Sequence, residues 1–169
     1  MMPRRPVNGF TLLEVMVTLF LVSILLSLVI PHLAPGKLEG LRLSASRFRH
    51  VLIWLRDQGA SGLADYRLRL DLTQGSYHPE VRDGENYLPV ADPLLAPGRV
   101  DPGVGRLVWI PDKSDLGELS DLAIPFTRFG PVKALLVQFV SNTEPNGFTV
   151  SYRPEWSHPR LEAGLKRWE

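Results

Sequence analysis

The sequence predicts an α+β protein, with a long N-terminal helix packed on a mostly antiparallel β-sheet domain. Three observations carry this prediction. Residues 10–30 form an apolar run that contains a single charged residue. Apolar residues between positions 37 and 58 recur at helical spacing. From about residue 66 onward, apolar and polar residues alternate in short stretches separated by turn residues, which is typical of strands.

Composition limits the classes of function open to the chain. Its 169 residues are the length of one ordinary domain. The 19 basic residues are offset by 18 acidic ones, so the net charge of +1 gives no general attraction for nucleic acid. The Arg-rich second helix and the C-terminal RLEAGLKRWE are locally basic, and we interpret both as solvated helix faces. The absence of cysteine excludes disulfides, thiolate catalysis and cysteine-ligated metals.

The first element is the apolar block of 21 residues at positions 10–30. A helix of that length rises by about 1.5 Å per residue and covers the ~30 Å hydrocarbon core of a bilayer. Arg4 and Arg5 precede the block, so the positive-inside tendency predicts a cytoplasmic N-terminus and an exported C-terminal domain. The alternative is a cleavable secretory signal, whose apolar core is usually about 7 to 15 residues long. The longer block favours a single-pass membrane anchor.

Glu14 is the only charged residue in this block. A charged side chain within a membrane-spanning helix costs roughly 2.5 to 3.5 kcal/mol, so it usually has a partner. No basic residue lies in the block, and Arg4 and Arg5 are too distant for pairing along one helix. Either Glu14 lies near enough to the membrane surface to stay hydrated, or its partner belongs to another molecule.

The stretch NGFTLLEVMVTLFLVSILLSLVIP resembles the N-terminal signature of type IV pilins and of type II secretion pseudopilins. That pattern is a basic leader ending in glycine, then phenylalanine, a glutamate four residues later and an apolar helix. The resemblance implies that a prepilin peptidase cuts after Gly9 and methylates the new amine of Phe10. It also implies that Glu14 pairs with the terminal amine of a neighbouring subunit and that Pro31 kinks the helix. Asn8 departs from the basic residue that often precedes the glycine.

A second helix is predicted from about residue 37 to residue 58, after a stretch rich in proline and glycine. Its apolar positions recur at spacings of four and three, and they are Leu41, Ala45, Phe48, Leu52 and Leu55. We expect this stripe to pack on the sheet of the same domain rather than on a ligand. The two glycines of GASG, residues 59–62, are predicted to end the helix.

Six stretches beyond the helix are predicted to be strands: YRLRLDL, SYHPEV, RLVWI, LAIPF, KALLVQFV and GFTVSYR. In the first of them, Leu68, Leu70 and Leu72 lie on one face. A short TQG turn joins the first two strands as a hairpin, and NTEPNG has the turn chemistry to join the last two.

The order of these elements resembles the H-type minor pseudopilins and their relatives among type IV pilus assembly proteins. The similar pieces are YRLRLDLTQGSY at the helix-to-sheet junction and, later, IPFTRFGPV, LLVQFVSN and GFTVSYRPE. This resemblance implies a pilin-like fold. Glu14 argues against the K-type tip subunit, which typically lacks that glutamate. The sequence shows no convincing counterpart of the calcium-binding C-terminal loop of G-type major pseudopilins.

Two loops are candidates for further sites. Four prolines in residues 88–103 make regular structure unexpected, so this segment is either a partner-contact loop with Leu94 and Leu95 exposed or a poorly ordered connector. Residues 111–121 contain Asp112, Asp115, Glu118 and Asp121, but they lack the spacing of a calcium loop. We interpret the second loop as solvated, and the sequence leaves cation binding between Asp112 and Asp121 open.

No constellation typical of an enzyme is visible. The histidines are His32, His50, His78 and His158, and their spacing makes no metal-ligand set. No nucleophile lies in a recognisable frame, and no phosphate-binding or dinucleotide-binding glycine motif is present. We therefore predict no enzyme activity, no cofactor and no metal.

The sequence thus predicts a leader peptide at 1–9, a transmembrane and assembly helix at 10–30, a kinked continuation with an amphipathic helix at 31–58, and a periplasmic β-rich domain at 59–169. The predicted function is that of an inner-membrane minor pseudopilin in the periplasmic pseudopilus of type II secretion. Its expected partners are the prepilin peptidase, other major and minor pseudopilins, the inner-membrane assembly platform and secreted cargo. The alternatives are a minor type IV pilin and, in another class, a membrane-anchored binding or enzyme domain.

Overall fold

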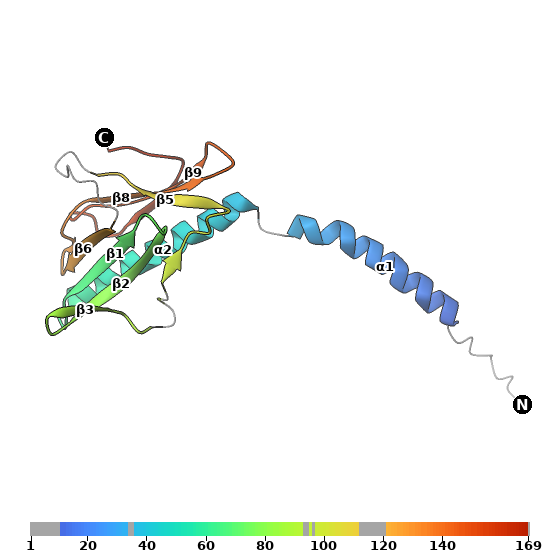
Figure 1. Cartoon of the computed structure of the whole chain (residues 1–169), viewed down its shortest axis with the longest axis horizontal. Coiled ribbons are helices and arrows are strands. Elements are labelled where there is room, and N and C mark those ends of the chain that lie inside the picture. The colour runs from blue at the N-terminus through green and yellow to red at the C-terminus, as the bar shows by residue number, and fades with distance from the viewer. Residues whose placement is uncertain (1–10, 34–35, 93–94, 96, 112–120, 169) are drawn as a thin grey trace, which may run out of the picture. The chain divides into compact units, whose positions relative to one another are not determined.

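The computed structural model describes residues 11–33, 36–92, 95, 97–111 and 121–168. Gly9 and Phe10 lie outside these residues, as do Leu94 and residues 112–120. The chain divides into two compact units, Met1–Pro35 and Gly36–Glu169 (Figure 1). The first unit contains the helix α1, Leu12–Leu33. The second contains the helix α2 and every described strand, which confirms the predicted α+β class.

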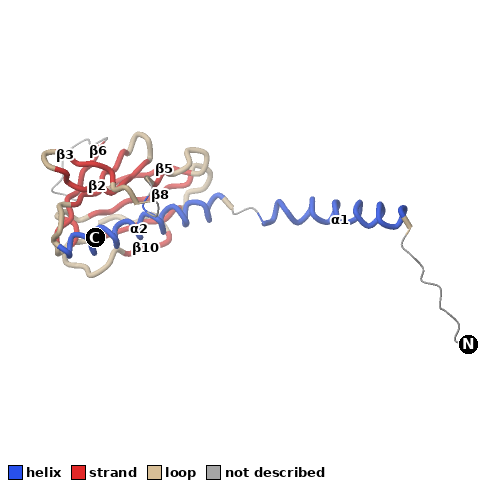
Figure 2. The backbone as a smooth tube through the Cα atoms, turned by 90° about the horizontal axis from the view of Figure 1, so that it is seen from below, coloured by secondary structure: helices blue, strands red, loops and turns tan. Residues whose placement is uncertain are grey.

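The second unit begins with α2, Lys37–Ser61, which packs against strands of both sheets described below. Figure 2 shows this helix running along one side of the strands. Burial of the predicted stripe is confirmed, because its five side chains are fully buried: Leu41, Ala45, Phe48, Leu52 and Leu55. The helix therefore forms because one apolar face is covered by sheet while the opposite face stays in water.

α2 extends three residues beyond the end at residue 58 that the sequence predicts. Gly59 does not end the helix. A Cβ at this position would lie 2.8 Å from the carbonyl oxygen of Thr127, so glycine here allows close approach of helix and strand. Gly62 ends the helix instead, with a left-handed φ of 66° and an N–H that donates to the carbonyl of Gly59 at 3.3 Å.

Sheet A is antiparallel, with the spatial order β3-β2-β1-β6-β7 and with β4 paired to β2. Its strands are β1 (Tyr66–Asp71), β2 (Ser76–Asp83), β3 (Asn86–Pro89), β4 (Gly98–Arg99), β6 (Asp121–Thr127) and β7 (Gly130–Pro131). The alternation predicted for β1 determines which of its side chains face the core. Leu68 and Leu70 are fully buried in the core, whereas Arg67 and Arg69 lie on the opposite face. The predicted hairpin between β1 and β2 is confirmed.

Sheet B is also antiparallel and has the order β10-β9-β8-β5. Its strands are β5 (Gly105–Trp109), β8 (Leu135–Ser141), β9 (Gly147–Tyr152) and β10 (Arg160–Ala163). Phe48 of α2 joins the two sheets through the core. Its ring lies edge-on to Tyr77 of sheet A, with centroids 4.8 Å apart, and 5.6 Å from the ring of Phe139 in sheet B. One aromatic side chain thus fixes the position of the helix against both sheets.

Three sequence interpretations are wrong. RLEAGLKRWE does not provide a helix face, because its first four residues form β10, an edge strand that hydrogen-bonds to β9. Leu95, expected to be exposed in the proline-rich segment, is buried in the core together with Val100. Regular structure also occurs there, since β4 lies in this segment, and Gly98 packs so closely that a Cβ would overlap the ring of Tyr77. Tertiary contacts that no local pattern encodes decide all three outcomes.

The C-terminal tail, residues 164–168, covers the face of sheet B that is turned away from the aromatic core. Thr149 is fully buried; its Oγ1 donates to the carbonyl of Gly164 at 2.7 Å and accepts from the N–H of Lys166 at 3.1 Å. Gln138 Nε2 donates to the carbonyl of Lys166 at 2.5 Å. Two polar side chains of the sheet are therefore buried because the backbone of the tail satisfies them.

Burial of Tyr77 makes the stability of the second unit sensitive to alkaline pH. Desolvation raises the pKa of Tyr77 to about 12, above the ordinary value of about 10. Because the folded state favours the neutral phenol, this contribution is fully present below about pH 10 and is lost as pH rises toward 12. We expect Tyr77→Phe to reduce the loss of unfolding free energy between pH 9 and pH 12 by about 2 to 3 kcal/mol.

Urea unfolding at several pH values, followed by tryptophan fluorescence, measures this difference. Tyr87→Phe is the matched control, because Tyr87 is half-exposed on β3 and lies outside the core. An equal alkaline loss in wild type and in Tyr77→Phe would show that burial of this phenol does not govern the response.

Candidate functional site

The N-terminus of α1 is built around Thr11 and Glu14. The N–H of Glu14 donates to Thr11 Oγ1 at 3.2 Å and to the Thr11 carbonyl at 3.1 Å. Thr11 is therefore the N-cap, and Glu14 is the third residue of the helix, the spacing of a capping box. A carboxylate in the first turn also interacts favourably with the positive end of the helix dipole. Glu14 itself is exposed, so its charge is presented at the surface of the unit.

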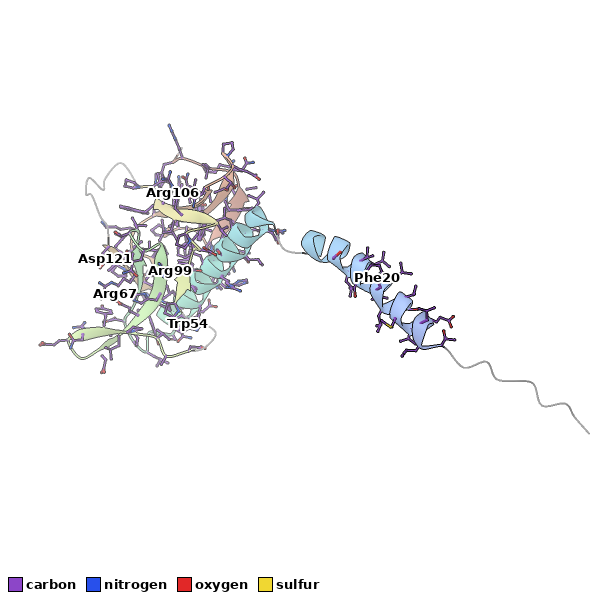
Figure 3. All side chains as sticks on the ribbon, turned by 45° about the vertical axis from the view of Figure 1, so that its right-hand side comes forward. Phe20, Trp54, Arg67, Arg99, Arg106 and Asp121 are labelled. Atoms are coloured by element: carbon purple, nitrogen blue, oxygen red, sulfur yellow. The ribbon has the colours of Figure 1, made fainter. Side chains whose placement is uncertain are left out.

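Between Leu12 and Ser27, most side chains of α1 are apolar, and they lie exposed on every side of the helix. Figure 3 shows Phe20, which is 66% exposed, among the side chains that project from α1. The other large apolar side chains that are exposed on α1 are Leu12, Leu13, Val15, Met16, Val17, Leu19, Leu21, Val22, Ile24, Leu25 and Leu26. A helix surface that is apolar all round is characteristic of apolar surroundings, such as the interior of a helix bundle.

The hydroxyl groups of α1 are satisfied within the helix itself. Thr18 donates to the carbonyl of Glu14 at 2.7 Å, and Ser23 donates to the carbonyl of Leu19 at 2.8 Å. Ser27 does the same with the preceding turn. These three hydroxyl groups are therefore not left without a hydrogen-bond partner. In an apolar environment, each unsatisfied polar group would cost on the order of several kcal/mol.

Over the part of the chain that the structure describes, no helix has both the length and the apolar character required to cross a membrane.

The other residues predicted for the N-terminal site are placed only in part. Gly9 and Phe10 lie outside the described residues, so the cleavage and methylation site stays a prediction. Pro31 lies within α1, two residues before its last residue Leu33. The kink predicted at Pro31 likewise stays a prediction.

The outward face of sheet A carries a cluster of charged side chains centred on Glu80. Although Glu80 points away from the core, its side chain is only 3% exposed. Arg67, directly opposite on β1, donates from Nε to Glu80 Oε2 at 2.5 Å. Arg69 Nη1 lies 3.5 Å from Glu80 Oε1, and His78 Nε2 lies 3.1 Å from the same oxygen. The guanidinium of Arg67 also covers the ring of Tyr87 at 3.8 Å. These contacts fix the register of β1 and β2.

Asp121 extends this cluster onto β6. Arg69 Nε and Nη2 donate to the two carboxylate oxygens of Asp121 at 3.1 and 2.5 Å. That hydrogen bonding, with the positive charge of Arg69, lowers the pKa of Asp121. The same pair raises the pKa of Arg69. Figure 3 shows Arg67 and Asp121 on the same side of the second unit. Asp121, the last residue of the acidic loop, thus pairs with arginine.

Among the residues described, no three histidine, aspartate or glutamate side chains gather as a metal site. The other three acids of that loop, Asp112, Asp115 and Glu118, lie outside the described residues. In the second unit, charged side chains of sheet A form ion pairs and apolar side chains form a packed core. The described surface of α1 is apolar and carries one carboxylate, that of Glu14. This arrangement suits the formation of protein–protein contacts.

Sequence reasoning missed two residues that the structure singles out. Thr11 was readable in principle, because T-x-x-E ahead of an apolar run is the capping-box signature. Glu80 was not, because alternation places it on the outward face, where it would ordinarily be exposed. Its burial depends on Arg67 and Arg69 of the neighbouring strand, and that pairing is visible only in the folded sheet.

The N-terminal segment matches a known sequence motif. Residues 4–30 match the prokaryotic N-terminal methylation motif, which includes Gly9, Phe10 and Glu14. No curated protein sequence matches this chain.

The second comparison concerns the fold. Two solved structures of the minor pseudopilin EpsH from the type II secretion system of Vibrio cholerae are similar to this chain, each at 13% sequence identity. One has a TM-score of 0.59 and the match covers 73% of this chain and 96% of that one. The other has a TM-score of 0.60 and covers 78% and 99%. This protein thus carries a prepilin-type N-terminal motif and has the fold of a minor pseudopilin.

Proposed function

We propose that this chain is a minor pseudopilin, a structural subunit of a type II secretion pseudopilus that supports protein export across the outer membrane. The observation that carries the proposal is the presence of two features in one chain. The N-terminal methylation motif occupies residues 4–30, and the chain has the fold of the minor pseudopilin EpsH. Either feature alone is less specific, because the motif occurs on diverse filament subunits and folds host many functions.

The surface of α1 supports an assembly role. Between Leu12 and Ser27 its exposed apolar side chains surround the helix, and its hydroxyls donate to its own carbonyls, so this surface suits the interior of a helical bundle. Glu14 is the one carboxylate on that surface. In the proposed filament it pairs with the methylated amine of Phe10 on a neighbouring subunit. Such a pair adds little net stability, but breaking it is costly, so it fixes the register between subunits.

The proposal includes a location and a set of partners. Before assembly, the chain is a single-pass inner-membrane protein with a cytoplasmic N-terminus and a periplasmic C-terminal domain. A prepilin peptidase removes residues 1–9 and methylates Phe10. The inner-membrane assembly platform then adds the chain to other major and minor pseudopilins, and secreted cargo contacts the completed pseudopilus.

Intact mass spectrometry after co-expression with a prepilin peptidase tests the processing step. We expect a chain that begins at N-methyl-Phe10, because Gly9 has no side chain that would shield the peptide bond after it. N-terminal fragmentation locates the methyl group. Expression without the peptidase is the control, and it is expected to leave the leader in place.

Two outcomes contradict the proposal. A chain that still begins at Met1 or Met2, with the peptidase active on a control substrate, would indicate a simple anchored domain. A cut near Pro31 would indicate an export signal. If processing occurs as expected, deletion in the native host separates the systems, because loss of protein export indicates type II secretion and loss of twitching or DNA uptake indicates a type IV pilus.

A further inference from the structure

A groove follows one edge of sheet B, between α2 and the edge strand β10. Figure 2 shows β10 next to α2. One stretch of the groove has a volume of about 730 Å³, and the side chains that line it include Leu38 and Arg42 of α2, Phe148 of β9, and Leu161 of β10. A second stretch, of about 770 Å³, includes Arg49 of α2 and Trp156. Leu161 lines both stretches, so we treat them as one groove and call it the edge groove.

The backbone of β10 directs hydrogen-bonding groups into the edge groove. The N–H of Gly164 donates to the carbonyl of Gly147 at 2.8 Å, so these two residues continue the ladder between β9 and β10 as a hydrogen-bonded pair. Such pairs alternate along an antiparallel ladder, and Leu161 and Ala163 therefore turn their N–H and C=O groups away from β9. β10 is the last strand in the order of sheet B, so no described strand of that sheet pairs with these groups.

A side chain of α2 already bonds to the neighbouring position of this edge. Pro159 lies two residues before Leu161, so its carbonyl is on the same side of the chain, and Arg49 Nε donates to it at 3.1 Å. Among the described residues, no side chain donates in the same way to the carbonyls of Leu161 and Ala163. The edge thus accepts hydrogen bonds from a group in the groove, and its remaining positions are open.

The side chains along β10 define which segment fits this edge. Leu161 packs against the core and, with Ala163, lines the groove beside Leu38, which is 38% exposed. Arg160 and Glu162 lie on the opposite face of the strand and are exposed, and neither forms an ion pair with a described residue. A strand added here is therefore complementary if it has apolar side chains across from Leu161 and Ala163. Between them it needs an acid across from Arg160 and a base across from Glu162.

We propose that the edge groove binds an extended segment of another subunit of the filament, which adds a fifth strand to sheet B. The segment runs antiparallel to β10, as every other pair in the sheet does, and it carries the alternation of apolar and charged side chains given above. Backbone hydrogen bonds hold such a segment, and the groove between strand and helix selects its side chains.

The position of the groove in the chain favours a subunit as its occupant, so the proposal rests on the proposed function. Gly36, which lines the groove, is three residues beyond Leu33, the last residue of α1, and this stretch of chain spans at most about 11 Å. In the proposed filament, α1 is surrounded by helices of other subunits, so segments of those subunits reach the groove. A minor subunit has mostly other proteins as neighbours, and the occupant is therefore a different subunit rather than a second copy.

Photo-cross-linking of the full-length chain, co-expressed with the other subunits, tests the contact. A photoreactive phenylalanine analogue replaces Arg160 in one variant and Glu162 in another, and peptide mass spectrometry identifies the residue that each one reaches. We expect both to reach one segment of another subunit. The residue reached from position 162 is expected to precede the residue reached from position 160 by two, as in an antiparallel strand. The analogue at Leu43 is the matched control, because Leu43 is 48% exposed on α2 and does not line the groove.

Ala163→Pro separates strand pairing from mere proximity. It removes an N–H that points into the groove and leaves the hydrogen bonds between β10 and β9 in place. We expect it to lower the cross-linking yield from both positions about tenfold, because one bond is lost and the proline ring occupies the edge. Ala163→Val keeps the N–H at an exposed position and is expected to match the wild-type yield. Equal yields from the two variants overturn the strand pairing.

Incorporation into the filament is read separately, by co-purification with the other subunits. An incorporated chain whose positions 160 and 162 cross-link no better than the Leu43 control overturns the contact and leaves the proposed function standing. Cross-links to a secreted protein, to a second copy of this chain, or to residues without the two-residue step also overturn it. A chain that is neither incorporated nor cross-linked overturns both the contact and the proposed function.

Discussion

Replacement of Glu14 by alanine is expected to leave membrane insertion unchanged and to lower incorporation into the filament by at least about tenfold. Insertion survives because removing a charge from an apolar helix makes the transfer into a bilayer easier. Incorporation falls because the amine at Phe10 of a neighbouring subunit would be buried without its partner, and breaking a buried pair costs about 3 to 5 kcal/mol. Membrane fractionation and co-purification with the other pseudopilins measure the two quantities.

Two further variants distinguish pairing from the local role of Glu14 at the start of α1. Glu14→Gln keeps the size of the side chain and removes its charge, so it is expected to behave like Glu14→Ala. Thr11→Ala removes the N-cap and keeps the charge, with a cost of about 0.5 to 2 kcal/mol to the helix. It is expected to incorporate far better than Glu14→Ala. Normal incorporation of the Glu14→Ala variant would rule out the proposed pairing of Glu14 with a neighbouring subunit.

Phe48→Ala is expected to destabilise the second unit by about 3 to 5 kcal/mol, a large share of the stability of a domain of this size. The side chain is fully buried and contacts Tyr77 and Phe139, so its removal leaves a cavity between the helix and both sheets. Urea unfolding of the full-length chain in detergent, followed by tryptophan fluorescence, measures the change. All four tryptophans lie in the second unit, so the signal reports on that unit alone.

Leu43→Ala is the matched control on the same helix. Leu43 is 48% exposed and faces solvent, so its truncation is expected to cost no more than about 0.5 kcal/mol. Equal losses for Phe48→Ala and Leu43→Ala would contradict the assignment of Phe48 as the side chain that joins α2 to both sheets.

The parts of this fold that could be predicted are those in which local sequence decides. The stripe of α2 and the alternation of β1 are periodic over several residues, and both predictions are confirmed. The N-terminal motif is also local, because its glycine, phenylalanine and glutamate lie within six consecutive residues, 9–14. It is therefore visible in the amino-acid sequence alone.

The parts that could not be predicted depend on neighbours distant in sequence. β4 and β7 are two residues long and too short for any period, so they exist only because β2 and β6 pair with them. Gly59 has the composition of a helix end, yet the approach of Thr127 keeps it inside α2. Leu95 lies between prolines, yet the core contacts of its segment bury it.

The C-terminal tail has a consequence for the order in which the protein is made. Residues 164–168 are the last described residues to leave the ribosome, and the buried hydrogen bonds of Gln138 and Thr149 are made only to them. Until then both side chains stay hydrated, and one face of sheet B is uncovered. A chain that lacks residues 164–168 therefore leaves a hydrated, open sheet surface, the kind of surface that quality-control proteases recognise.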